Sequence, residues 1–286
     1  MIEKLIIALK GMFIGGTMLV PGVSGGSMAM ILGIYDELIS AVSSFLKNIK
    51  KNILFLMIFC GGALLGMAIF AKPLGILLEK FPVVLMYFFI GAVAGSSPMM
   101  LRKAEVKKIS WRAFVYPAIG IAAVRLISMI PKGVMTAGEK NVWFYIMLIL
   151  TGVIVAIALI LPGISVSHMM LMLGLYDTII EIINKRDIMG MISLAPLGIG
   201  LALGIIFCTK FLEAAMSRKP QATYLIIFGF LLGSLIDKEV FPGFPTGWQI
   251  PVCILLFALG FVVIFMLCKA EEKREAAKTQ EEALQS

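Results

Sequence analysis

The sequence is poor in charged residues and holds a single histidine. Charged residues make up 15% of the 286 residues, while 60% are hydrophobic and the mean hydropathy is +1.01. Because a soluble domain carries about 25% charged residues, this composition excludes a soluble domain. The P-loop, HExxH and glycine-rich dinucleotide motifs are all absent from the sequence. We therefore predict neither an enzyme nor a bound cofactor.

Cysteine is also scarce. The four cysteines lie in apolar runs and none belongs to a CxxC pair, so neither a metal site nor a disulfide is predicted. The net charge of +8 is what basic cytoplasmic loops of a membrane protein produce, and it does not indicate nucleic-acid binding. A basic balance also suits an anionic lipid headgroup.

Ten hydrophobic segments fill most of the chain. They lie near residues 5–20, 24–45, 53–71, 83–100, 113–130, 142–161, 165–183, 188–212, 222–236 and 249–268. Several approach the roughly 20 residues that a helix needs to cross a bilayer. The fold class that we predict is an all-α polytopic integral membrane protein, surrounded by membrane lipids.

An internal repeat runs through these segments. The stretch from Pro21 to Ser27 returns 141 residues later as the stretch from Pro162 to His168. Further matches follow at a shift of 138 residues, and among them are Gly-xxx-Gly pairs that suit close helix packing. We predict membrane repeats at residues 1–140 and 141–270, followed by a charged cytoplasmic tail at 271–286 that is either helical or disordered.

The repeats are expected to have inverted topology, with broken or re-entrant helices. Five segments per repeat is an odd number, so the second copy enters the membrane from the opposite side. If residues 5–45 and 146–183 form re-entrant hairpins, three crossings per repeat remain, which is also odd. Loop charge does not separate ten crossings from six crossings and two hairpins.

Loop charge does predict the orientation. With the N-terminus inside, 17 lysines and arginines lie in cytoplasmic stretches and seven in external ones. By the positive-inside rule both termini are cytoplasmic.

The repeated Pro-Gly-x-Ser motifs are the main candidate site. Proline and glycine break a helix, and a serine caps the helix that starts after the break. A helix that starts at membrane depth presents free N–H groups and the positive end of its dipole, which bind anions. The residues expected to converge on one anion are Ser24, Gly25, Gly26, Ser27, Ser165, Ser167 and His168. The alternative is a packing kink with capped ends.

Two residues could add positive charge to this site. His168 replaces Ser27 in the second copy, and beside an anion it would favour its protonated form. It could instead be a neutral histidine that donates to a backbone carbonyl. Arg125 lies within an apolar segment, where an arginine is a functional candidate, although it could also reach the interface.

Three acidic residues follow the motifs. Asp36 and Asp177 occupy matched positions, and Glu37 accompanies the first. They could face the site, bind a cation or mark a helix that approaches the surface. We treat them as candidates for coupling or gating.

The motifs also resemble a known family. The string from Val20 to Ser27, continued by Ile31 to Asp36, is similar to the signature of the DUF368 family of bacterial membrane proteins, and the strings at 161–165 and 173–177 are similar to its second copy. The resemblance covers essentially the full chain. It implies translocation of undecaprenyl phosphate, the C55 lipid carrier, back across the bacterial cytoplasmic (inner) membrane for reuse in cell-wall synthesis. The implied partner is therefore a polyprenyl-phosphate lipid.

Two other functions remain open at this stage. A secondary transporter of small anions or ions would need a closed aqueous path instead of a lateral cleft. An intramembrane enzyme acting on a lipid phosphate would need a nucleophile and a positioned base, and the sequence offers no convincing pair.

Overall fold

Every regular element in the described part of the chain is an α-helix. The computed structural model describes residues 2–18, 24–106, 110–129, 142–164, 166, 169–170, 173–175, 179, 181–182, 185, 188–235 and 243–285, and for residues 2, 271 and 274–285 it describes the backbone alone. The helices are α1 (Ile2–Thr17), α2 (Gly25–Ile31), α3 (Tyr35–Ser43), α4 (Ile49–Lys80), α5 (Pro82–Lys103), α6 (Arg112–Ser128), α7 (Val142–Ile160), α10 (Ile188–Ser193), α11 (Ala195–Arg218), α12 (Pro220–Leu235) and α13 (Gln249–Gln285).

Long apolar helices confirm the predicted polytopic membrane protein. By length and composition, α4, α5, α7, α11 and the first 22 residues of α13 can each cross a membrane. The pair α2 and α3 passes the same test only as a broken span or a re-entrant loop. Beyond its apolar part α13 continues through the predicted tail as a helix to Gln285.

A sharp bend corrects one sequence prediction. Residues 24–45 were expected to form one segment, but α2 and α3 are separate helices inclined at 118°. Gly33 has a φ of +70°, and the amide of Ile34 donates to the carbonyl of Ala29 at 3.0 Å. This is the hydrogen bond of a glycine-terminated helix end, and it uses carbonyls that the helix leaves without partners.

The second copy has the same turn. Gly174 has a φ of +76°, and the amide of Leu175 donates to the carbonyl of Met170 at 3.0 Å. These residues match Gly33, Ile34 and Ala29 at the shift of 141. The duplication is therefore present in local hydrogen bonds as well as in sequence.

Close helix pairs within each half repeat the pattern. Helix α1 packs along α4, and α7 packs along α11. A β-carbon on Gly62 of α4 would overlap the carbonyl of Ala8, and one on Gly200 of α11 would overlap the carbonyl of Ile149. Both partners of each contact match in the repeat, so the Gly-xxx-Gly pairs are packing seams as predicted.

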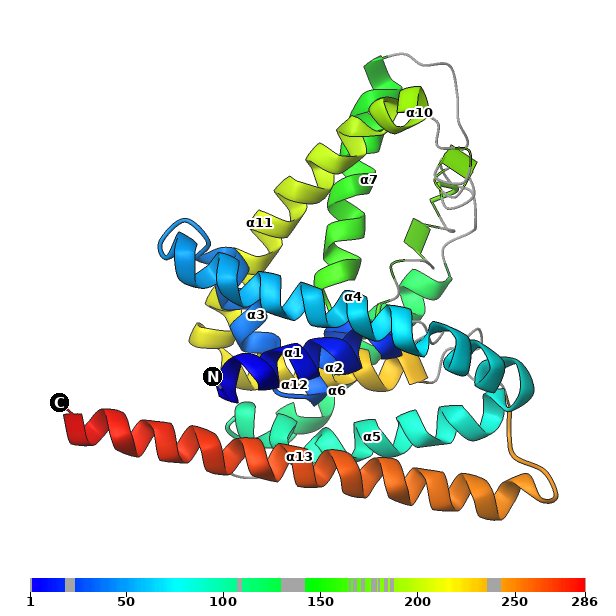
Figure 1. The fold of residues 1–286 in the computed structure, drawn as a ribbon, viewed down its shortest axis with the longest axis vertical. Helices are drawn as coiled ribbons and strands as arrows, with labels where there is room; N and C mark the ends of the chain where they lie inside the picture. The colour runs from blue at the N-terminus through cyan, green and yellow to red at the C-terminus, as the bar shows by residue number, and fades with distance from the viewer. Residues whose placement is uncertain are drawn as a thin grey trace.

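Two further pairs exchange helices between the halves. Helix α5 of the first half packs along α13, and α12 of the second half packs along α6 (Figure 1). A β-carbon on Gly91 would overlap the carbonyl of Phe257, whereas one on the matched Gly229 would overlap that of Pro117. Such reciprocal contacts are what two copies related by a two-fold operation make. The inverted orientation of the copies in a membrane, and the repeat boundaries, stay predictions.

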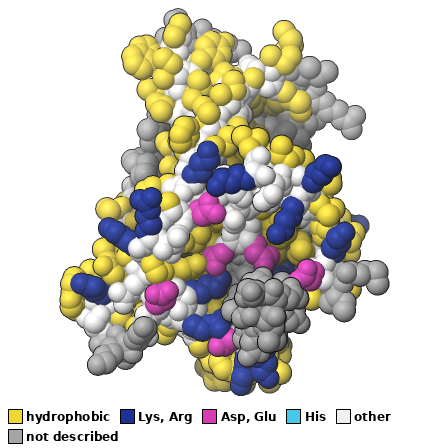
Figure 2. All heavy atoms as spheres, turned by 90° about the vertical axis from the view of Figure 1, so that its left-hand side faces the viewer, with side chains coloured by type: hydrophobic (Ala, Val, Ile, Leu, Met, Phe, Trp, Pro, Cys, Tyr) yellow, Lys and Arg dark blue, Asp and Glu magenta, His cyan; other side chains and the backbone are white. Residues whose placement is uncertain are grey.

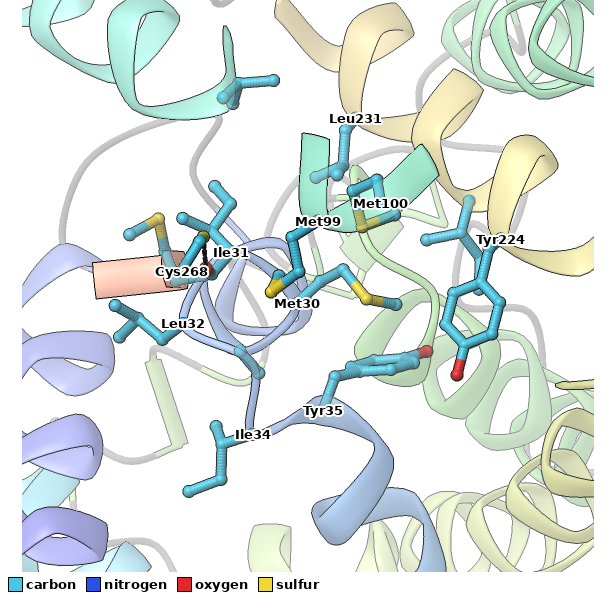
Figure 3. Packing of buried hydrophobic residues seen from close by; sticks show 14 of the residues in the cluster. Met30, Ile31, Leu32, Ile34, Tyr35, Met99, Met100, Tyr224, Leu231 and Cys268 are labelled. Atoms are coloured by element: carbon cyan, nitrogen blue, oxygen red, sulfur yellow. Dashed lines mark hydrogen bonds between the residues drawn. The ribbon is translucent and has the colours of Figure 1, made fainter. Parts of the chain in front are cut away.

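The short helix α2 lies in the largest hydrophobic cluster, together with the end of α5 and the middle parts of α12 and α13. Met30 and Ile31 of α2 are almost fully buried, and Met100 of α5 and Leu231 of α12 pack in the same cluster (Figure 3). The thiol of Cys268 donates to the carbonyl of Ile31 at 3.4 Å. Helix α2, which follows the first motif, therefore lies in the packed centre of the protein.

The seams predict a difference between two glycines of α4. Gly66→Ala should lower the melting temperature of the detergent-solubilised protein, because the new methyl group would overlap the carbonyl of Met12. Overpacking of this kind costs about 1–3 kcal/mol. Gly61→Ala is the matched control, since nothing lies within 4 Å of its β-carbon position. It should keep or raise the melting temperature, because alanine favours a helix by about 1 kcal/mol over glycine. Equal melting temperatures for the two variants would contradict the seam.

Candidate functional site

The first motif forms the capped start of α2. Helix α1 ends at Thr17, and the next helix begins at Gly25 with Ser24 as its N-cap in an extended conformation. The amide of Ser27 donates to the Ser24 hydroxyl oxygen at 3.1 Å. The predicted capping role of Ser24 is thereby confirmed.

The second motif lies directly against this start. The amide of Gly163 donates to the hydroxyl oxygen of Ser27 at 2.7 Å and to that of Ser24 at 3.1 Å. Gly163 has a φ of +86°, and a β-carbon there would overlap the carbonyl of Phe230 on α12. Glycine is required at this position for both reasons. The two motifs, far apart in the sequence, therefore share one set of hydrogen bonds.

The end of α7 completes the junction. The Tyr35 hydroxyl donates to the carbonyl of Ile160 at 2.8 Å in a buried position. A β-carbon on Gly26 would lie 3.2 Å from the same carbonyl oxygen. The last carbonyl of one broken helix and the first turn of the other thus face each other closely.

The junction presents hydrogen-bond donors. The first amides of a helix have no acceptor within it, and among the described residues nothing accepts from the amides of Gly25 and Gly26. Both glycines are half-buried, and Ser27 beside them is buried. Chemically, such a group can bind an anion through neutral donors in a region of low dielectric constant.

Arg125 lies in the last turn of α6 and is half-buried. In the described part of the chain it makes no hydrogen bond or ion pair. Two residues further on, Ile127 packs against a cluster that includes Ile164, the residue that follows Gly163. The end of α6 therefore lies near the second motif, although the guanidinium of Arg125 makes no hydrogen bond to Ser24 or Ser27, the motif serines that the structure describes.

Asp36 forms an ion pair that the sequence did not suggest. Its carboxylate lies 2.5 Å from the ammonium group of Lys103, at the last turn of α5. The side chains are 34% and 13% exposed, and the second carboxylate oxygen of Asp36 is buried without a partner among the described residues. The pair links α3, and so the Tyr35 contact, to α5.

Glu37 lies elsewhere, in a polar cleft of about 350 Å³ between α1, α3 and α4. Lys10, Lys51 and Asn52 are among the residues that line this cleft. Glu37 and Asp36 therefore do not face a common point. Ser165, Ser167, His168 and Asp177 lie outside the described residues, so their predicted roles remain proposals.

Sequence reasoning missed Tyr35, Lys103 and Ser234, the last of which lies on α12 next to the junction. Two of them had a signal in the repeat. Tyr35 recurs at position 176, and Ser234 recurs from position 96 at the shift of 138. No sequence signal pointed to Lys103, because its pairing with Asp36 depends on the approach of α5 to α3.

Comparisons with known proteins agree with one another. The family described as undecaprenyl phosphate translocase-like matches residues 14–249. The chain is 32% identical over 283 residues to the polyprenyl-phosphate transporter of Staphylococcus aureus, covering 95% of this chain and 99% of that protein. It is 30% identical over 263 residues to the polyprenyl-phosphate transporter of Vibrio cholerae, covering 85% of this chain and 79% of that protein. No solved structure matches the chain.

The junction predicts unequal effects of two neighbouring substitutions. Gly26→Ala should lower the melting temperature, because its methyl group would press on the Ile160 carbonyl and the Pro162 backbone. Gly25→Ala is the matched control: its methyl group would meet only the flexible end of Met18. We expect Gly26→Ala to be less stable by about 1 kcal/mol, the lower end of overpacking costs. A lower melting temperature for Gly25→Ala would contradict this geometry.

The Asp36–Lys103 pair predicts non-additive effects. Lys103→Gln and Asp36→Asn should each destabilise the protein, since each leaves one charge without its partner. The double variant should lose less than the sum of the two, with a coupling of about 1 kcal/mol for a partly exposed pair. Thermal unfolding of the four proteins measures this coupling, and additive losses would mean that the ion pair contributes nothing.

Proposed function

The chain belongs to the undecaprenyl phosphate translocase-like family, and on this premise we propose that it transports a polyprenyl phosphate across the membrane. The two relatives from Staphylococcus aureus and Vibrio cholerae are both named polyprenyl-phosphate transporters. We propose undecaprenyl phosphate as the substrate and the bacterial cytoplasmic membrane as the location. Transport back to the cytoplasmic leaflet would return the carrier for cell-wall polymer synthesis.

The shared hydrogen bonds of the two motifs carry this proposal. The Gly163 amide reaches Ser27 and Ser24 from the other half of the chain. A phosphate at this junction would accept from the amides of Gly25 and Gly26, whose lack of side chains lets it approach the backbone. A ligand held between the halves is also in the place where relative movement of the halves can expose it to either leaflet.

Arg125 is the proposed source of formal charge. Its place at the end of α6, near the second motif, would allow a charge-assisted hydrogen bond to a lipid phosphate. Ser165, Ser167 and His168 of the second copy are proposed to complete the site from the opposite side.

The prenyl chain is proposed to remain in the lipid. Large apolar side chains such as Leu64 of α4 and Ile254 of α13 are exposed on the protein surface, as lipid-facing residues are. A lipid substrate then needs only its headgroup to enter the protein, through a lateral opening between the halves. This requirement separates it from a small soluble anion, which needs a closed aqueous path.

The proposed orientation places the N-terminus inside. Figure 2 views the molecule from the side on which Figure 1 marks the N-terminus. Lysine, arginine and acidic side chains gather on this face, and the part above them is mainly hydrophobic. A face rich in basic residues suits the cytoplasmic side by the positive-inside rule. The cleft that contains Glu37 lies at the beginning of α1, next to Glu3.

Gating is proposed for the acidic residues after the motifs. The Asp36–Lys103 pair holds α3 to α5, while Tyr35 of α3 holds the end of α7. The Tyr35 hydrogen bond crosses between the halves, and the neighbouring Asp36–Lys103 pair holds the helix that carries Tyr35. This position makes Asp36 a candidate gate. Glu37 and the matched Asp177 are the other candidates.

The test is movement of labelled undecaprenyl phosphate in proteoliposomes. We expect the wild-type protein to translocate it, Arg125→Ala to weaken transport at least tenfold, and Gly26→Val to abolish transport. A hydrogen bond to a charged group contributes about 1.5–3 kcal/mol, and 1.4 kcal/mol is a factor of ten. Gly61→Ala, on the open side of α4, is the control for reconstitution.

Three further results discriminate among functions. Competition by inorganic phosphate with no movement of the lipid would favour a small-anion transporter. Release of phosphate from the lipid would favour an enzyme. Full activity of correctly folded Gly26→Val and Arg125→Ala proteins would place the site elsewhere and leave the motifs a packing role.

A further inference from the structure

The hydrogen bonds of the Ser24–Ser27 pair leave one donor without an acceptor. The two hydroxyl oxygens lie 2.8 Å apart, so one hydroxyl donates to the other. Ser24 already accepts from two amides, those of Ser27 and Gly163. A hydroxyl oxygen has two lone pairs, and that of Ser24 already faces two amide hydrogens, of which the Gly163 hydrogen is shared with Ser27; we therefore assign Ser24 as the donor and Ser27 as the acceptor.

The remaining donor is the hydroxyl of Ser27. Its oxygen accepts from Ser24 and from Gly163, and among the described residues no atom accepts its hydrogen. Ser27 is only 6% exposed. A buried donor without an acceptor costs about 1–3 kcal/mol, so this arrangement indicates an acceptor that the described residues do not supply.

A small cavity lies beside this hydroxyl. It measures about 20 Å³ and lies between α2, α5 and α12. Since one water-sized atom needs about 10–15 Å³, the cavity has room for one oxygen atom and little more. Its lining is apolar except for two hydroxyl groups, those of Ser27 and Ser234.

Ser234 is an unusual residue in its helix. It is 7% exposed, follows a run of large apolar residues in α12, and donates to the carbonyl of Leu231 at 2.8 Å. Rotation about its Cβ–Oγ bond is enough to direct this hydrogen into the cavity, because hydroxyl hydrogens turn to suit their acceptors. Ser27 and Ser234 can then donate to the same oxygen atom.

We propose that this cavity is a subsite for one unesterified phosphate oxygen, and that Ser234 of α12 is a substrate-binding residue. The inference rests on the proposed function and adds α12 to the parts of the protein that contact the phosphate. One phosphate oxygen accepts from the hydroxyls of Ser27 and Ser234, while the remaining oxygens face the amides of Gly25 and Gly26. Because α12 belongs to the second half and α2 to the first, the bound phosphate accepts hydrogen bonds from both halves.

The test uses binding of two probes to the full-length protein in detergent. Farnesyl phosphate carries the phosphate on a short prenyl chain, and farnesol is the same chain without it. We expect Ser234→Ala to weaken binding of farnesyl phosphate about tenfold, as for a lost hydrogen bond to a charged group, and to leave farnesol binding unchanged. Ser193→Ala is the matched control, because Ser193 on α10 makes the same bond to the carbonyl three residues earlier but lies away from the cavity.

A double-mutant cycle tests the shared oxygen. If Ser27 and Ser234 donate to one atom, the loss for the double variant should be smaller than the product of the two single losses. A change in packing alone would lower the melting temperature and reduce binding of both probes together. Inorganic phosphate is added as a competitor, and displacement of farnesyl phosphate by it identifies the headgroup as the bound part.

The outcomes separate the two proposals. If the wild-type protein does not bind farnesyl phosphate more tightly than farnesol, the phosphate site itself fails, and this inference fails with it. If the wild-type protein discriminates and Ser234→Ala discriminates equally well, the subsite is overturned while the proposed function stands. Equal weakening by Ser193→Ala would also overturn it.

Discussion

Backbone hydrogen bonding at broken helices is the constraint on which this structure depends. In a membrane there is no bulk water to bond with the ends of a helix, and each unsatisfied group costs several kcal/mol. The protein satisfies some of these groups across its two halves: Gly163 donates to Ser24, which precedes α2, and to Ser27 in its first turn, while Ile160 accepts from Tyr35. Each half therefore supplies hydrogen-bond partners to the other at this junction.

The same constraint explains why the junction suits an anion. The hydroxyl oxygens of Ser24 and Ser27 accept from protein donors, whereas one hydroxyl hydrogen of this pair and the amides of Gly25 and Gly26 have no acceptor among the described residues. Acceptors are thus used internally and donors are left over. A site with excess donors, and with no acidic partner among the residues that the structure describes, favours a ligand that only accepts, and a phosphate is such a ligand.

Exchange of helices makes the halves interdependent. Helices α5 and α12 each bury a glycine seam against a helix of the other half, so either half alone would expose Gly91 or Gly229. The sequence indicated the glycine pairs and their repetition, but it could not show that two of the seams cross between the halves. Local pattern reveals that a face is smooth enough for close packing, and only the fold decides which helix covers it.

Short-range patterns in the sequence determined much of this protein. Composition and apolar length determined the membrane class, the first Pro-Gly-x-Ser motif determined where α2 starts, and Ser24 caps this helix as its residue type predicts. These are effects of hydropathy and of neighbours within about four residues. The bend at Gly33, by contrast, was hidden inside one apolar segment, because a glycine is tolerated both within a helix and at its end.

Only the tertiary structure decided the polar partners. Asp36 contacts Lys103, Tyr35 contacts Ile160, and Ser234 faces Ser27 across a cavity. These contacts arise because α5, α7 and α12, from distant parts of the chain, converge on α2 and α3. No sequence spacing encodes such partners, since they depend on the directions that the chain takes after each break. The sequence by itself therefore predicted two donor-rich helix starts, and the packing of α2 against α5, α7 and α12 decided what surrounds the first of them.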